Sequence, residues 1–331
     1  MTKSLFNIQR QGILSNLWPR FVTAPHLTIV SSLISPVYGR NIATTYCRMD
    51  SIDPDASPKP CAPVVEYMPL EDIEKPERYR PGGYHPISIG DRLSNRYTVV
   101  HKLGFGTYST TWLAKDMNMD KYVAIKIAIA GTDMLESKIL NTLALSEPSD
   151  EEQPGEALIP QVLDTFSIDG PNGRHQCLVT EPGMMTLAEA KDASYTRLFR
   201  MPVAKAIAAQ VIQAVAFLHH RGVVHADLHP GNIMFRLPNS IDKLSPGELY
   251  QKYGQPNVSP FVRLDGKPLS DGVPTHGVMP IWLGKESELV ALSEAKIFVT
   301  DFGESFLPSV TQRHSYASCM TSIYIVSKPE N

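Results

Sequence analysis

The spacing of apolar and polar residues predicts a β-rich region followed by a helical one. Residues 96–104, 110–116 and 121–129 are rich in Val, Ile, Thr and aromatic side chains, and short polar turns separate them. Such runs are typical of β-strands. Residues 132–144 then repeat apolar side chains at helical spacing, which predicts one helix after the third strand.

The second part of the chain combines two more strands with a long helix. The runs "VLDTFSI" and "HQCLVT" have the composition of strands. The segment from Pro202 to His220 is strongly helical, because Pro202 suits a first turn and Gly222 closes the helix. A Pro-, Gly- and Ser-rich insertion, 238–295, precedes a last strand that ends in "DFG".

The residues before the first strand differ in composition from the rest. Residues 50–82 are rich in Pro, Asp and Glu, which predicts an extended linker. Residues 1–49 contain five basic and no acidic side chains, as mitochondrial transit peptides do. Their apolar residues, however, spread around a helical projection. A transit peptide and a plain basic arm therefore both remain open.

Charge and cysteine content narrow the class of protein. The net charge of the 331 residues is −3, and without residues 1–49 it is −8. An acidic body disfavours general nucleic-acid binding and mildly favours a basic partner. The four cysteines form no CxxC pair, which suits a reducing compartment. No run of 18 apolar residues occurs in the sequence, so no membrane span is expected.

The stretch "VVHADLHPGNIMF" has the spacing of a phosphotransferase catalytic loop, with His, Asp and Asn placed between a helix and a strand. Asp227 can accept or orient the proton of an attacking hydroxyl, and Asn232 can bind Mg²⁺. Asp301, in the "DFG" at the end of the last strand, can chelate the Mg²⁺ that bridges the phosphates.

Four residues of the β-rich region and the helix after it complete a nucleotide site. Gly104-x-Gly106 lies between two predicted strands, where glycines let backbone amides approach phosphate oxygens. Lys126, inside an apolar strand, needs an anion, and Glu136 on the next helix is a natural ion-pair partner. Each feature is weak alone, since a turn, an edge lysine or a solvated helix would explain it. Their order along one chain predicts a phosphotransferase.

The segment "YRPGGYHPISIGDRLSNRYTVVHKLGFGTYSTTWLAKD" resembles the start of the SR-protein kinase family, and "DFGESF" is similar to its fungal members. The resemblance covers about residues 79–237 and 296–315. It implies a bilobal, α+β protein-kinase-like fold with a complete β-rich N-lobe and a partial helical C-lobe. The implied segments are a linker and N-terminal extension (50–95), an N-lobe with hinge (96–183) and a partial C-lobe (184–331) that contains the insertion.

By the same resemblance the chain is expected to be a Ser/Thr protein kinase that uses ATP and Mg²⁺. Its protein substrates are expected to be basic and Ser/Arg-rich, its location cytoplasmic and nuclear, and its complete form monomeric. The matching positions imply catalytic roles for Asp227, Lys126 and His229. They imply Mg²⁺ ligation by Asn232 and Asp301. The implied nucleotide-binding residues are Leu103, Gly104, Phe105, Gly106, Thr107, Ala124, Lys126, Glu136, Thr180 (the gatekeeper), Glu181 and Gly183.

The sequence departs from the protein kinase pattern in the catalytic loop and after the "DFG". Ala226 and His229 replace the usual Arg and Lys, and 28 residues follow Gly303 without an "APE" motif. We therefore expect the isolated chain to transfer phosphate negligibly and to need a partner for the apolar face of the 202–220 helix. The residues expected on that face are Ile207, Val211, Ile212, Val215, Ala216 and Leu218.

Two other functions remain open at this point. The text "HADLHPGN" also occurs in kinase-like small-molecule phosphotransferases, so a small-molecule acceptor is the alternative to a protein acceptor. An inactive pseudokinase or regulatory fragment is the third reading, which rests on the C-lobe segments that do not follow Gly303. A mitochondrial location is the alternative if residues 1–49 act as a transit peptide.

Overall fold

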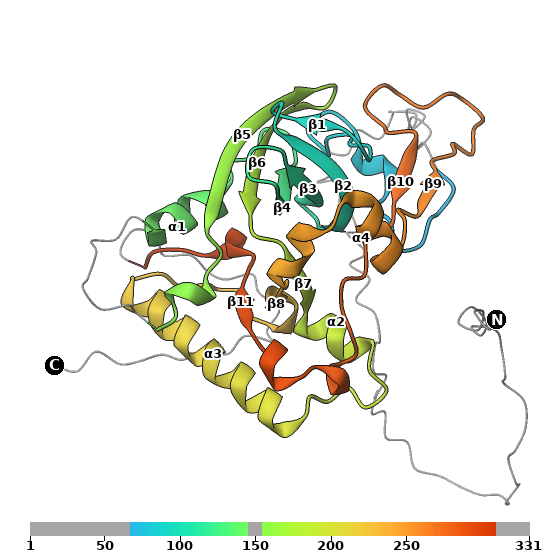
Figure 1. Ribbon diagram of the computed structural model, residues 1–331. Helices are drawn as coiled ribbons and strands as arrows, with labels where there is room; N and C mark the ends of the chain where they lie inside the picture. The colour runs from blue at the N-terminus through green and yellow to red at the C-terminus, as the bar shows by residue number, and fades with distance from the viewer. Residues whose placement is uncertain (1–66, 145–153, 309–331) are drawn as a thin grey trace, which may run out of the picture. The chain divides into compact units, whose positions relative to one another are not determined.

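The computed structural model describes residues 67–144 and 154–308. The chain divides into two units, Met1–Pro60 and Cys61–Asn331, and every described residue belongs to the second. The expectations for residues 1–49 and for the last 23 residues lie outside the described part. Figure 1 shows the arrangement of the described elements.

A six-stranded antiparallel sheet forms the first lobe, with the order β1-β2-β3-β4-β6-β5. All five predicted strands are confirmed, and a short strand, β1, is added at the edge. Alternating apolar positions of β2, β3 and β4 bury Tyr97, Trp112 and Ile125 in one core. The strands are β1 (Arg92–Leu93), β2 (Tyr97–Phe105), β3 (Ser109–Asp116), β4 (Lys121–Ala128), β5 (Val162–Gly170) and β6 (Gly173–Thr180).

Helix α1 (Leu135–Ala144) follows β4, three residues later than the predicted start of this helix at residue 132. Its apolar face buries Ile139, Leu140 and Leu143 in a second core, and Phe302 of the "DFG" lies in the same core. The packing of α1 therefore brings Glu136, in the first turn of the helix, next to the segment that carries Asp301.

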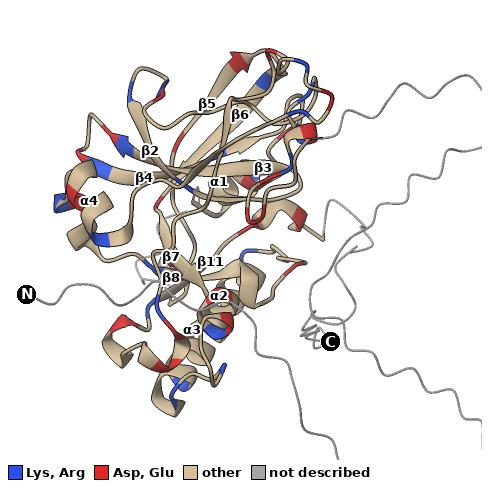
Figure 2. Ribbon diagram, turned by 90° about the vertical axis from the view of Figure 1, so that its right-hand side faces the viewer, with Lys and Arg blue, Asp and Glu red and all other residues tan. Residues whose placement is uncertain are grey.

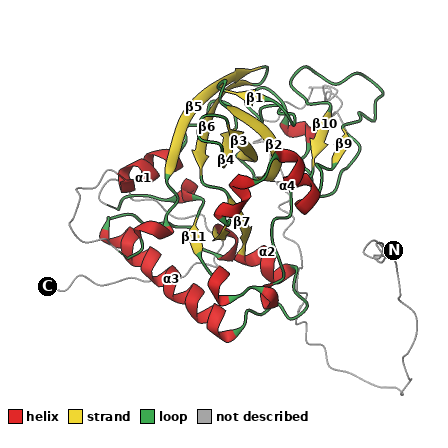
Figure 3. Cartoon of the chain, viewed as in Figure 1, coloured by secondary structure: helices red, strands yellow, loops and turns green. Residues whose placement is uncertain are grey.

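The second lobe combines helices with a small three-stranded sheet of order β11-β8-β7 (Figure 3). Its elements are α2 (Leu187–Asp192), α3 (Met201–His220), β7 (Gly183–Thr186), β8 (Ile233–Arg236) and β11 (Ile297–Val299). Pro202 stands in the first turn of α3, as predicted. The catalytic-loop motif joins α3 to β8, and the "DFG" follows β11, so the antiparallel pair β8–β11 holds both motifs close together.

The exposed face of α3 differs from the expected one. Ile207 and Leu218 are buried, whereas Ile212 is 65% exposed. Leu218 packs into the core formed with α1 and Phe302, and Ile207 packs against β8 and β11. These partners come from distant parts of the sequence, so the helical pattern alone did not identify the covered side. Of the others expected on that face, Ala216 is exposed and Val211 and Val215 are half-buried.

By length and composition α3 could cross a membrane, the one such helix in residues 67–144 and 154–308. This is weak evidence, because the core helices of other proteins pass the same test. Phe217 and Leu218 of α3 lie in the core with α1, and 28% of the apolar window of this helix is buried.

The insertion 238–295 folds back onto the first lobe. It contains α4 (Pro246–Tyr253), which begins with a capping box of Ser245 and Glu248, and the strand pair β9 (Val258–Pro260) and β10 (His276–Val278). Leu249 of α4 packs against Val100 and Leu113 of the large sheet. The insertion therefore leaves the second lobe, covers the first and returns to β11 (Figure 1).

The prediction of an extended linker over 50–82 is wrong for its described part. Tyr67, Ile73 and Tyr79 are each less than 10% exposed, and they pack with Phe261 and Val273 of the insertion. The Pro- and Glu-rich composition resembles a linker because its buried residues are spaced widely and their partners lie almost 200 residues later in the chain.

Charged residues of both signs are interspersed over the described fold. Figure 2 shows Lys and Arg next to Asp and Glu on α4 and around α2 and α3. In contrast, most charged side chains that line the cavity beside Lys126 are acidic.

Candidate active site

A cavity of about 350 Å³ lies between the glycine loop, β4, α1 and the "DFG" segment. Six of the predicted site residues line it: Gly106, Thr107, Lys126, Glu136, Asp227 and Asp301. Other acidic side chains in the lining are Asp133 and Glu304. Among the described residues of this lining, Lys126 is the one basic side chain, so the cavity carries an excess of negative charge.

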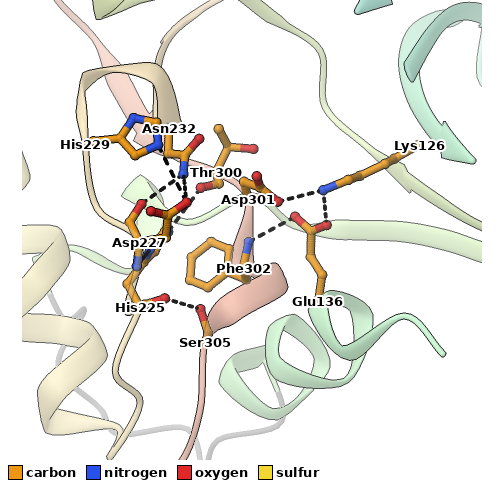
Figure 4. A network of polar contacts seen from close by, with 10 residues as sticks. All are labelled: Lys126, Glu136, His225, Asp227, His229, Asn232, Thr300, Asp301, Phe302 and Ser305. Carbon is orange, nitrogen blue, oxygen red and sulfur yellow. Dashed lines mark hydrogen bonds and ion pairs between the residues drawn. The ribbon is translucent and has the colours of Figure 1, made fainter. Parts of the chain in front are cut away.

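Lys126 on β4 joins α1 to the "DFG" (Figure 4). Its Nζ lies 2.5 Å from Oε2 of Glu136 and 2.9 Å from Oδ1 of Asp301. The second oxygen of Glu136, Oε1, accepts a hydrogen bond of 3.2 Å from the backbone N–H of Phe302. Glu136 thus fixes both the ammonium of Lys126 and the backbone beside Asp301.

The two carboxylates control the protonation of this network. Burial alone would lower the pKa of Lys126, but the charges of Glu136 and Asp301 raise that pKa above its ordinary value. Burial opposes ionisation of Asp301, yet the charge and hydrogen bond of Lys126 outweigh it and lower the pKa of Asp301. Near neutral pH the site therefore contains an ammonium and an ionised Asp301.

Asp227 and Asn232 form the second half of the site. The amide nitrogen of Asn232 donates to the backbone oxygen of Asp227 (2.9 Å) and to its Oδ2 (3.1 Å). This arrangement leaves the amide oxygen as the atom that Asn232 can offer to a cation. His225 supports the loop from below, because its Nε2 donates to the backbone oxygen of Thr300 and its backbone oxygen accepts from Ser305. Burial lowers the pKa of His225, which favours the neutral ring.

The backbone of the loop sets the tautomer of His229. Its Nδ1 accepts a hydrogen bond of 3.0 Å from the N–H of Gly231, so the proton of the neutral ring is on Nε2. Nε2 lies 3.6 Å from Oδ2 of Asp227. A Cβ at residue 231 would stand 2.9 Å from Nδ1, which explains the glycine. Sequence reasoning missed Gly231, although "HPG" is a local signal for this turn.

Two residues of the site have left-handed backbone conformations. Asp301 has φ 63° and Ala226 has φ 66°. Non-glycine residues adopt such angles at an energetic cost, which is often found at functional sites. At these two positions the backbone turns just before Phe302 and just before Asp227.

The glycines of the loop between β2 and β3 are not required by packing. Gly104 and Gly106 have no positive φ, and a Cβ at either would meet no atom within 4 Å. Their missing side chains leave open space beside the cavity, as a phosphate-binding loop requires. Leu103, Gly104 and Phe105 belong to the end of β2, outside the cavity lining.

The predicted hinge residues lie apart from this cavity. Thr180 ends β6 and pairs with Ala124 of β4, and Glu181 forms an ion pair of 2.5 Å with Arg236. Gly183 allows close contact with β8, since a Cβ there would lie 2.5 Å from Cε of Met234. The lining of the Lys126 cavity does not include Ala124, Thr180, Glu181 or Gly183. The cavity therefore brings together predicted phosphate-binding residues but not the predicted adenine-binding ones.

The donor atoms present fit a magnesium–nucleotide complex. Asp301 and Asn232 offer oxygen atoms, which Mg²⁺ prefers. The described residues contain no cluster of three or more His, Cys, Asp or Glu side chains arranged for a metal ion. Mg²⁺ in nucleotide sites is commonly held by one or two carboxylates together with the phosphates, so such a cluster is not required.

Comparisons with known proteins agree with this arrangement. A family model described as protein kinase domain matches residues 97–245. The chain is 38% identical over 171 residues to SRSF protein kinase 3 of Homo sapiens, covering 50% of this chain and 30% of the relative. It is 34% identical to serine/threonine-protein kinase spk-1 of Caenorhabditis elegans, covering 50% and 17%. A serine/threonine protein kinase of Aspergillus fumigatus is 29% identical over 192 residues, covering 56% and 48%.

The chain thus spans between about a sixth and a half of the length of these relatives. A crystal structure of the kinase domain of PF14_0431 is 19% identical and superposes weakly, with a TM-score of 0.47 over 70% of this chain and 57% of that one. The expected α+β kinase-like fold is confirmed by the family match and by the sheet and helices described above. Residues 97–245 therefore match a protein kinase domain, and the chain is similar to SR-protein kinases over about half of its length.

Proposed function

We propose that this domain binds Mg-ATP and serves a Ser/Thr protein kinase, which transfers the γ-phosphate to protein hydroxyls. The observation that carries the proposal is the meeting of Lys126, Glu136, Asp301 and Asp227 around one cavity. These residues come from β4, α1, the "DFG" and the catalytic loop, and the packing of α1 on Phe302 and the pairing of β8 with β11 bring them together. Phosphoryl transfer depends mainly on positioning and charge stabilisation, which such a site supplies.

Each side chain has a proposed role. Mg-ATP supplies the transferable phosphoryl group when bound. Lys126, oriented by Glu136, contacts the phosphates, and Asp301 with Asn232 holds Mg²⁺. Asp227 accepts or orients the proton of the substrate hydroxyl. Nε2–H of His229 is directed toward the side of Asp227, where it can donate to the transferring phosphate.

The acceptor is proposed to be a basic, Ser/Arg-rich protein segment. The name of the human relative, SRSF protein kinase 3, supports this class. The acidic side chains of the cavity lining, Asp133 and Glu304, also suit a basic segment by charge. The proposed location is cytoplasmic and nuclear, and the proposed complete protein is a monomer. Both proposals rest on the family resemblance alone.

Calorimetry and a sensitive transfer assay test the proposal. Residues 1–331 should bind ATP with Mg²⁺ present, and Asp301→Asn should weaken that binding. Asp271→Asn, an exposed aspartate outside the cavity, serves as the matched control. Transfer is measured under single-turnover conditions, which also detect rates far below the roughly 1–100 per second that is typical of kinases.

The choice of acceptor separates the three functions. A Ser/Arg-rich peptide should gain phosphate slowly, and Asp227→Asn should abolish this transfer. A matched peptide with Ala for Ser should gain none. Transfer to a small-molecule panel instead would support the small-molecule phosphotransferase. Nucleotide binding without any transfer would favour a regulatory domain, and no Mg-ATP binding would overturn the proposal altogether.

A further inference from the structure

The glycine loop is held from outside the cavity by residues that precede the sheet. The phenol of Tyr84 donates a hydrogen bond to the backbone oxygen of Gly106. The guanidinium Nη1 of Arg78 donates to the backbone oxygen of Thr107 over 3.3 Å. Gly106 and Thr107 are the loop residues that line the cavity beside Lys126. These contacts therefore act on the part of the loop nearest the proposed phosphate site.

Tyr84 is itself firmly placed. It is 3% exposed, and its ring lies 5.5 Å from that of Tyr79 in an edge arrangement. Its backbone oxygen accepts a hydrogen bond of 2.7 Å from Asn172, whose amide also donates to Gly272 of the insertion. The sheet and the insertion thus hold Tyr84 together, so its phenol is a fixed donor.

Peptide geometry connects these contacts with the cavity. In a trans peptide unit the C=O and the following N–H point in opposite directions. Fixing the C=O of Gly106 toward Tyr84 therefore directs the N–H of Thr107 to the other side of the loop. In the same way, the contact of Arg78 with the oxygen of Thr107 fixes the direction of the N–H of Tyr108. Successive backbone N–H groups held in this way form an anion site.

We infer that Tyr84 is a positioning residue for nucleotide phosphates, and that Arg78 assists it more weakly. The inference rests on the proposed function, because the anion concerned is the phosphate chain of Mg-ATP. Without the hydrogen bond of Tyr84 the loop gains conformational freedom, and binding must then order it. The loss should concern the phosphates of the nucleotide and spare its adenosine part, because the predicted adenine-binding residues Thr180, Glu181 and Gly183 do not line the cavity beside Gly106 and Thr107.

The test compares two tyrosines that lose the same kind of hydrogen bond. Tyr84→Phe removes the donor to Gly106. Tyr250→Phe is the matched control, since the phenol of Tyr250 donates to the backbone oxygen of Val100 in β2, away from the loop. Calorimetry on the full chain should show ATP and ADP binding weakened about 3–10-fold by Tyr84→Phe, the equivalent of one hydrogen bond. Adenosine binding should stay unchanged, and Tyr250→Phe should have no effect on any of the three.

Hydrogen–deuterium exchange tests the clamp without nucleotide. The N–H of Gly106 donates to the oxygen of Ser109 over 2.9 Å inside the loop. In the free protein, exchange over residues 106–109 should accelerate in Tyr84→Phe and remain at the wild-type rate in Tyr250→Phe. Unchanged exchange in Tyr84→Phe would overturn the inference. If wild-type protein bound no ATP, the proposed function would fail, while the exchange result would still decide whether Tyr84 holds the loop.

Equal losses for ATP and adenosine would also overturn the inference, because a general structural role would predict them. Arg78→Gln tests the weaker of the two contacts with the glycine loop. Its contact is longer and exposed, so the loss of ATP affinity should be smaller than that of Tyr84→Phe. Rescue by Arg78→Lys, which keeps a donor of similar reach, would be consistent with a hydrogen-bonding role.

Discussion

Two lysine–glutamate pairs, each with its lysine in the large sheet, differ in burial, in further partners and in the pKa of the lysine. Lys102 on β2 pairs with Glu74, and neither side chain is more than 2% exposed. Lys126 on β4 pairs with Glu136, where the lysine side chain is 25% exposed and faces the cavity. Burial lowers the pKa of Lys102, whereas the pKa of Lys126 is raised because two carboxylates outweigh its burial.

The difference distinguishes a closed structural pair from an open site. Glu74 has its second oxygen occupied by the phenol of Tyr79, and the ammonium of Lys102 lies 5.2 Å from the ring centroids of both Phe105 and Trp112. Lys126 instead shares its charge between Glu136 and Asp301, so the group carries one net negative charge next to a cavity. Such an excess can be neutralised by a bound cation, as a magnesium–nucleotide complex would do.

Removing one member of the closed pair should have the largest effect on stability. Lys102→Met leaves the carboxylate of Glu74 buried without a cation, which is expected to cost about 3–5 kcal/mol of unfolding free energy. Urea denaturation measures this loss. Lys126→Met should cost clearly less, because its cavity admits water and its carboxylates can be solvated.

A double variant separates charge from packing in this comparison. Lys102→Met combined with Glu74→Leu replaces the whole pair by apolar side chains and should recover much of the lost stability. Equal destabilisation by Lys102→Met and Lys126→Met would contradict the distinction between a closed and an open pair.

The open pair should show its largest effect in nucleotide binding. Lys126→Met removes a charge-assisted contact with the phosphates and should weaken Mg-ATP binding by about 10–100-fold. Calorimetry with and without Mg²⁺ gives the affinities, and near-ultraviolet circular dichroism checks that the fold persists. Lys115→Met, at a lysine of β3 that pairs with Asp120 and lies outside the cavity lining, is the matched control. Retained Mg-ATP affinity in Lys126→Met would refute the role of the open pair.

The two pairs also show what the sequence could predict. Lys126, Glu136 and Asp301 were predicted because each belongs to a motif with a fixed order along the chain. The pair of Lys102 with Glu74 was not, because Glu74 lies in a Pro- and Glu-rich stretch whose composition resembles a linker. Local composition reports whether a segment can form a strand or a helix. It does not report that widely spaced aromatic residues, such as Tyr79, meet an insertion far along the chain.

The same limit applies to the second lobe. The helix at 202–220 was predicted from its pattern, but the side that it buries depends on α1, β8 and β11, which lie elsewhere in the sequence. The tautomer of His229 depends on a hydrogen bond from Gly231, and "HPG" signals a turn there without giving the partner of Nδ1.

His85 is a third kind of titratable group, half-buried and without an opposite charge beside it. Burial, with the nearby His175, lowers the pKa of His85 from 6.5 to about 4, and its buried Nδ1 has no hydrogen-bond partner among the described residues. Between pH 6.5 and about 4, His85 therefore binds a proton in the unfolded chain but stays neutral in the folded chain. The free energy of unfolding should fall by about 1–3 kcal/mol as the pH drops from 6.5 to 4.

Urea denaturation across this pH range measures the slope. His85→Gln should flatten it, and His219→Gln, at an exposed position on α3, should leave it unchanged. The slope should persist in Lys126→Met, because the pKa of Lys126 lies above 10.5 and does not enter this range. A slope that vanished in Lys126→Met would assign the acid sensitivity to the open pair instead.

The smallest expected effect concerns His229, whose Nε2 lies 3.6 Å from Oδ2 of Asp227. Its ring is a neutral donor at a position where a lysine would supply a second ammonium in addition to that of Lys126. Nε2–H can donate to a phosphate, but a charged donor forms a stronger hydrogen bond. His229→Lys should therefore match or exceed the wild-type rate of transfer, and His229→Ala should fall about 2–10-fold below it, the equivalent of one neutral hydrogen bond. Single-turnover transfer to a Ser/Arg-rich peptide near pH 8 measures the series, with His219→Ala as control. If His229→Ala were as fast as wild type, the donor would have no part in transfer, and Lys126 would be the sole basic group acting on the phosphates among the described residues of the cavity.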